Sequence, residues 1–117
     1  MTTSKSRKQV KRVIVVNTDY VAGKEVKETL GIARGSTIRA KNIGKDIKAG
    51  FRSIVGGKIT EYSQMFEESR EEAINLMVED AKKMGADAVV NVRFTTSMVM
   101  SGAAEILAYG TAVKLGR

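Results

Sequence analysis

The clearest pattern in the chain is a helical alternation of apolar and polar residues between positions 61 and 84. Thr60 can cap the start of this helix, and Gly85 supplies the residue that ends it. Apolar side chains fill about half of the helical wheel and charged side chains the rest, which predicts one packed side and one solvated side. The apolar half consists of Tyr62, Met65, Phe66, Ala73, Ile74, Leu76, Met77, Ala81 and Met84.

Two charged residues of this helix, Arg70 and Asp80, fall within or beside the apolar half. A charge in that position is either buried with a partner or placed at a protein contact or a cleft. We favour a structural role for this pair.

The segments outside the long helix alternate with a period of two, which is typical of strands. In the strand predicted at 88–96, Val90, Val92 and Phe94 should share one face. In the extended segment from Val26 to Ile43, Ile38 should lie on the packed face and Arg39 on the solvated one. The predicted elements are a strand at Val10–Val16, an extended segment from Val26 to Ile43 with a turn or bulge at Gly35, a short helix at 45–55 ended by Gly56-Gly57, and two strands at 88–96 and 104–115.

This order predicts an α+β domain of two layers, in which the long helix covers one face of an antiparallel sheet. Residues 1–9 have no apolar residue after Met1 and are expected to form a disordered basic arm, so that 10–117 form the single domain. One helix covers only part of four strands, and the chain has only three Phe and three Tyr as large aromatic side chains to fill the core. Either small side chains suffice or another subunit covers the rest; outward positions such as Leu107, Tyr109 and Val113 favour a homo-oligomer.

Composition restricts the chemistry sharply, because the 117 residues contain no His and no Cys. Serine–histidine and cysteine–histidine catalysis are excluded, as are zinc fingers and iron–sulfur ligation. We therefore predict that the protein is not an enzyme. The longest early apolar run, residues 13–16, is far too short to span a membrane, so we expect a cytoplasmic protein without a membrane partner.

The net charge of +7 is unevenly distributed along the chain. Residues 1–12 carry +5, residues 13–58 carry +5 and residues 59–117 carry −3. A solvated surface with a disordered arm explains this distribution, and the alternative is a polyanion such as nucleic acid, bound through the arm. The bases available for that contact are Lys5, Arg7, Lys8, Lys11 and Arg12.

Two weaker chemical signals remain. The carboxylates of the long helix fall mainly on its wet side, whereas Glu105 lies near the start of an apolar strand and is a candidate site residue. Met98 and Met100 would lie on one face of an extended segment, where their thioethers could bind a soft metal such as Cu(I), although methionines more often fill gaps in cores or interfaces.

The chain resembles the YbjQ-like family, which is labelled as heavy-metal-binding. The resemblance runs from about Asn17 to Lys114 and rests on Gly31, Gly35, Gly56-Gly57, Tyr62, Arg70, the block Gly85-Ala-Asp-Ala-Val-Val90 and the closing Gly110-Thr-Ala-Val113. It implies a subunit similar to that of dodecin, assembling as a ring-like homopentamer, with no established reaction. No matching position here is Cys or His, which weakens the metal label for this chain.

Together these observations predict a homo-oligomeric binding or scaffold protein with no evident catalytic machinery. The alternatives are metal binding through carboxylate or methionine ligands, nucleic-acid association through the arm, and a cofactorless enzyme that uses Tyr, Arg and carboxylates. The cofactor is unknown, and the ligand site is expected between subunits, with four polar candidates: Tyr62, Arg70, Asp80 and Glu105.

Overall fold

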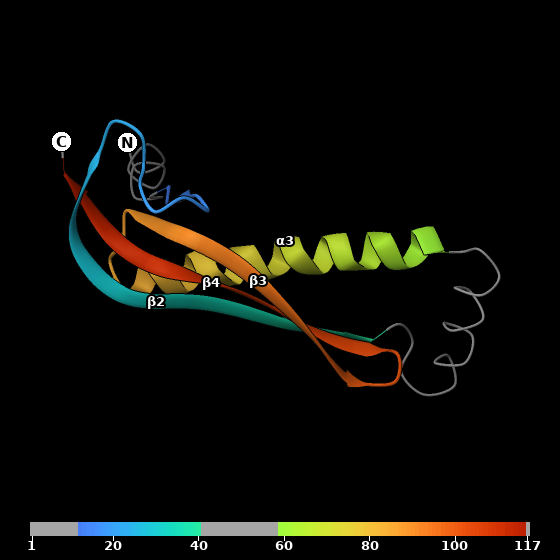
Figure 1. Cartoon of the computed structure of the whole chain (residues 1–117). Coiled ribbons are helices and arrows are strands. Elements are labelled where there is room, and N and C mark those ends of the chain that lie inside the picture. Colours follow the sequence, from blue (N-terminus) through green and yellow to red (C-terminus); the bar gives the residue numbers. More distant parts are fainter. Residues whose placement is uncertain (1–11, 41–58, 117) are drawn as a thin grey trace, which may run out of the picture.

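The computed structural model describes residues 12–40 and 59–116, with side chains for 12–39 and 63–116. The predicted helix at 45–55 and the predicted disordered arm at 1–9 lie outside the described residues. The described elements are β1 (Ile14–Val15), β2 (Glu25–Ala40), α3 (Ile59–Lys83), β3 (Ala88–Met100) and β4 (Ala103–Gly116). They form a four-stranded sheet in the order β1-β3-β4-β2, with α3 along one of its faces (Figure 1). The α+β class is confirmed.

The sheet is mixed, so the expectation of an antiparallel sheet is wrong for its first strand. β1 pairs in parallel with β3, from Ile14 opposite Ala88 to Val15 opposite Val89. The long crossover through β2 and α3 allows this direction, because parallel neighbours cannot be joined by a tight turn. β3, β4 and β2 pair antiparallel as predicted.

β2 runs without a break through Gly35, where a turn or bulge was expected. The register shifts instead at 26–28 and at 29–31, where Gly31 has φ 135°. Gly35 is needed for a different reason, which is the close approach of α3. A Cβ placed there would overlap the backbone of Ala73 and Met77 and lie 2.7 Å from Cβ of Leu76.

The prediction of the long helix is confirmed, with an earlier start. α3 begins at Ile59, so Thr60 lies inside it rather than capping it. Its end follows the Schellman pattern: Ala86 N–H donates to Ala81 O at 3.0 Å and Gly85 N–H to Lys82 O at 3.0 Å. Gly85 takes the left-handed conformation, φ 83°, that this ending requires.

The main core lies between α3 and the sheet, on what we call the helix face. It is built mostly from alanine, so small side chains do fill part of the space and bring the helix backbone close to β2. Leu76, expected on the packed side of the helix, is exposed because the buried stripe is narrow and runs at every fourth residue, through Ser69, Ala73, Met77 and Ala81. The core comprises Ala33, Ala73, Met77, Ala81, Ala86, Val89, Val92, Ile106, Ala108 and Ala112.

A second, smaller core covers the β1 end of the opposite face, which we call the open face. Val21, from the loop before β2, packs there with Ala88, Val90 and Val113. Val90 and Val92 therefore point to opposite faces instead of sharing one. The cause is a register shift between Val90 and Arg93, with Asn91 at φ 55°.

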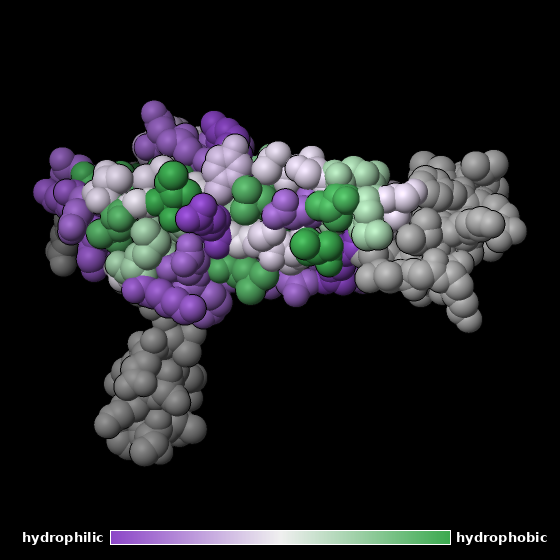
Figure 2. Space-filling view, turned by 90° about the horizontal axis from the view of Figure 1, so that it is seen from below, coloured by the Kyte–Doolittle hydropathy of each residue, from purple (hydrophilic) through white to green (hydrophobic). Residues whose placement is uncertain are grey.

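Beyond this loop, no described residue covers the open face. The faces of β2 are also the reverse of the expectation: Thr37 is buried against the helix, whereas Ile38 is exposed on the open face. Figure 2, viewed from below Figure 1, shows hydrophobic residues exposed among hydrophilic ones along the molecule. Among the described residues, no helix is long and apolar enough to span a membrane.

Candidate functional site

The polar residues predicted to form a ligand site do not meet within one chain. Arg70 and Asp80 are ten residues apart on α3, which separates them by about 15 Å along the helix. Arg70 is exposed. The side chain of Tyr62 lies outside the described part of the structure, so its prediction stays open.

Asp80 has a structural contact. Its Oδ2 accepts a hydrogen bond of 3.0 Å from the backbone N–H of Arg34 in β2. Arg34 is in the strand at the end of the sheet, so this carboxylate fixes α3 to the sheet and occupies one N–H of the outer edge of β2. This agrees with a structural role for Asp80.

Glu105 lies on the open face, the opposite side of the sheet from Arg70 and Asp80. Its face follows from strand alternation, because Ile106 and Ala108 belong to the core beneath α3. Its Oε2 accepts a hydrogen bond of 2.7 Å from the hydroxyl of Ser36 on β2. Glu105 therefore contributes to a cross-strand polar contact.

The two methionines proposed as a soft-metal site do not share a face. A register shift between them pairs Met98 with Ala104 and Met100 with Ala103. Adjacent residues of β4 point to opposite faces, so the two thioethers do as well. The alternation expected from the sequence is lost at this irregularity.

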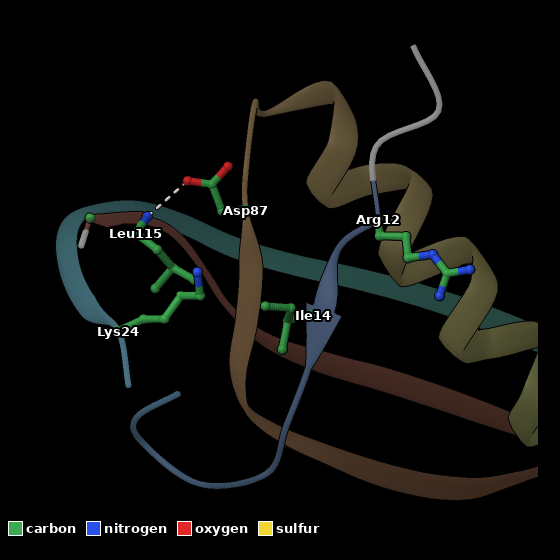
Figure 3. Close-up of a pocket in the computed structure, with 6 residues that line it drawn as sticks. Arg12, Ile14, Lys24, Asp87 and Leu115 are labelled. Atoms are coloured by element: carbon green, nitrogen blue, oxygen red, sulfur yellow. Dashed lines mark hydrogen bonds between the residues drawn. The ribbon is translucent and has the colours of Figure 1, made fainter. Parts of the chain in front are cut away.

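A depression of about 410 Å³ lies where β1, β3 and β4 meet (Figure 3). Arg12 and Lys24 line it, but Figure 3 shows Arg12 directed toward α3 and Lys24 on the other side of Ile14, so the two cations do not converge. Asp87 accepts a hydrogen bond of 2.8 Å from Leu115 N–H and thereby joins the start of β3 to the end of β4.

A row of three side chains crosses the open face and was missed by sequence reasoning. Arg34 of β2 and Arg93 of β3 are both register partners of Tyr109 in β4, which lies between them. Arg93 is held toward the loop before β2, because its Nη1 donates to Asn17 O at 3.0 Å and to Val92 O at 3.1 Å. Only the strand register, which no local pattern reveals, brings these residues together.

An open depression of about 360 Å³ lies along this row. We call it the Arg34–Tyr109 depression. It combines one cation, one phenol ring, the hydroxyl of a threonine and two aliphatic side chains, and it is lined by Ile32, Arg34, Thr95, Leu107 and Tyr109.

These surfaces define a small α+β protein with a mixed four-stranded sheet, an uncovered sheet face and, among the described residues, no assembled catalytic centre. Residues 13–116 match the YbjQ family, whose description is "Putative heavy-metal-binding", and the chain belongs to this family. The resemblance seen in the sequence is thereby confirmed.

Relatives and a solved structure agree with this assignment. The chain is 73% identical over 103 residues to a UPF0145 protein of Methanosarcina acetivorans, covering 88% of this chain and 97% of the relative. It is 59% identical over 105 residues to a UPF0145 protein of Archaeoglobus fulgidus, covering 90% and 97%. A protein of unknown function from Pediococcus pentosaceus, of the DUF74 family, has a similar fold, with a TM-score of 0.56, 14% identity and coverage of 89% and 98%.

The family description implies a metal, so its fit to this chain matters. Heavy metals favour thiolate, thioether or imidazole ligands, and the chain has neither Cys nor His. The described residues hold no group of three or more carboxylates placed for a metal ion, and Met98 and Met100 point apart. The residues that the structure describes therefore do not fit a metal site.

Proposed function

We propose that this protein is a non-catalytic scaffold that assembles with copies of itself through the two outer edges of its sheet. The observation that supports the proposal is that both edges are unpaired among the described residues and carry exposed apolar side chains. The assembly would be a closed ring, and five subunits is the number that the family resemblance implies.

The first edge belongs to β2, whose only described sheet neighbour is β4. The N–H of Arg34 points away from β4, because it donates to Asp80. Backbone groups alternate in direction along an antiparallel strand, so Ile32, Ser36 and Ile38 also direct their N–H and C=O groups outward. Ile32 and Ile38 have side chains 64% and 65% exposed.

The second edge belongs to the far half of β3. The N–H of Val92 donates to Val16 O at 3.1 Å, on the side away from β4. By the same alternation, Phe94, Thr96 and Met98 direct their backbone groups outward, beyond the reach of β1. Phe94 is 42% exposed and Met98 69% exposed.

A long edge strand with exposed apolar residues is a template for pairing with another strand. The β2 edge and the part of β3 that extends beyond β1 lie on opposite sides of the sheet, so the β2 edge of one copy can pair with the β3 edge of the next. Such head-to-tail contacts close into a ring when the rotation between copies permits it.

Native mass spectrometry tests the proposal. The wild-type chain should appear as a multiple of its 12.7 kDa mass, and Met98→Lys should shift the distribution toward the monomer because a charge then lies on the β3 edge. Asn75→Lys is the control, since Asn75 is exposed on the side of α3 that faces away from the sheet. A monomeric wild type, or equal dissociation by both variants, would refute the edge assembly.

A further inference from the structure

The Arg34–Tyr109 depression is complete within one chain, and its residues fall on neighbouring strands of a rigid sheet. Directly opposed residues on adjacent strands have Cβ atoms about 5 Å apart, so Arg34 and Arg93 lie on either side of Tyr109 in the sheet. Tyr109 is 36% exposed, which leaves part of its ring accessible from the open face.

The guanidinium of Arg34 is available to a ligand. No described carboxylate forms an ion pair with it: Glu105, the acidic residue on this face of β4, bonds to Ser36, and Asp80 contacts only the backbone of Arg34. Arg93 is held by two carbonyl groups on the other side of Tyr109. Arg34 is therefore the cation of the depression itself, and the guanidinium of Arg93 is directed away from the ring, toward the loop before β2.

The lining indicates the chemistry of the ligand. Guanidinium groups bind phosphate or carboxylate through paired hydrogen bonds. The ring of Tyr109, beside Ile32 and Leu107, offers a surface on which a flat ring can stack, and the hydroxyl of Thr95 can bond to a polar ring substituent. A volume of about 360 Å³ lies at the small end of the range for ligand pockets.

We propose that the Arg34–Tyr109 depression binds a planar aromatic anion, with the anionic group on Arg34 and the ring against Tyr109. This inference does not depend on the assembly, because every residue that lines the depression belongs to one chain. Its failure would not affect the proposed scaffold role, and a monomeric protein could still bind the ligand.

Isothermal titration calorimetry with adenosine monophosphate tests the site. Adenosine, which lacks the anionic group, and inorganic phosphate, which lacks the ring, are the comparison probes. We expect binding of the monophosphate, and at least tenfold weaker binding of either part. Arg34→Gln should weaken binding of the monophosphate at least tenfold, whereas Arg70→Gln, which removes an exposed arginine from α3, should leave it unchanged.

Tyr109 is tested by two variants, so that loss of the fold is distinguished from loss of the ring. Tyr109→Phe should retain binding and Tyr109→Leu should weaken it, with circular dichroism confirming that both are folded. No binding of the monophosphate to the wild type, equal binding of adenosine, equal binding of phosphate, or equal loss in Arg34→Gln and Arg70→Gln would each overturn the proposal.

Discussion

Gly35 sets the distance between α3 and the sheet. The atoms that a Cβ at this position would meet include backbone atoms of Ala73 and Met77, which cannot move without displacing the helix. Small residues on both sides of this contact, such as Ala33 and Ala73, let the two backbones approach closely.

Gly35→Ala should therefore destabilise the fold by roughly 3 kcal/mol, as overpacking of a rigid contact does. Urea denaturation at a fixed protein concentration measures the change. Gly23→Ala is the control: Gly23 has φ 76° but no atom within 4 Å of an added Cβ, so its cost should be only about 1 kcal/mol of backbone strain. Gly35 itself has no positive φ, so similar costs for the two variants would show that the close approach of α3 at Gly35 is less tight than the structure indicates.

Ser69 contributes a buried polar atom to the same helix stripe. Its side-chain Oγ has no hydrogen-bond partner among the described residues, although its backbone carbonyl accepts a bond from the hydroxyl of Thr37. A buried hydroxyl without a partner costs free energy. Ser69→Ala should thus leave the melting temperature unchanged or raise it, and a clear fall measured by calorimetry would show that the hydroxyl is bonded in solution.

At the scale of elements, Asp80 joins α3 to the outer edge of β2. Asp80→Ala should lower the free energy of unfolding by about 1 kcal/mol, because it removes the acceptor for Arg34 N–H. Asp80→Asn keeps an acceptor oxygen and should cost less. Chemical denaturation compares the two, and equal losses would mean that the charge matters more than the hydrogen bond.

The sequence predicted the long elements and their order well, because α3 and the β3–β4 hairpin have strong local periodicity. It failed where distant segments decide the outcome. Gly35 lies in an unbroken strand because α3 packs on it, and Ile38 is exposed because Thr37 faces the helix. The parallel pairing of β1 could not be predicted, since nothing within residues 10–16 specifies which strand lies beside them.

The candidate site was harder to predict than the fold. Glu105 was chosen from its apolar surroundings, and its partner Ser36 became visible only from the register of β2 with β4. Arg34 and Tyr109 are far apart in the sequence and carry no motif. A binding surface on a sheet depends on which strands are neighbours, and that information is not local.

At the scale of the whole molecule, the basic segment at 1–12 lies outside the matched family region, which starts at residue 13. The proposal that it binds a polyanion makes a separate prediction. Deleting residues 1–9 removes Lys5, Arg7 and Lys8, so affinity for single-stranded DNA should fall and its salt dependence should become shallower. Fluorescence anisotropy over a range of salt concentrations measures both, and unchanged affinity would exclude the arm as the contact.

The two outer edges of the sheet differ in sequence, and head-to-tail pairing would therefore give each copy one donor end and one acceptor end. Ile38→Lys would block one end and Met98→Lys the other, so each variant alone should be monomeric. Mixed together, an intact β2 edge from the Met98 variant can pair with an intact β3 edge from the Ile38 variant, and growth stops there. Two variants that cannot assemble alone should therefore form a heterodimer when mixed, and nothing larger.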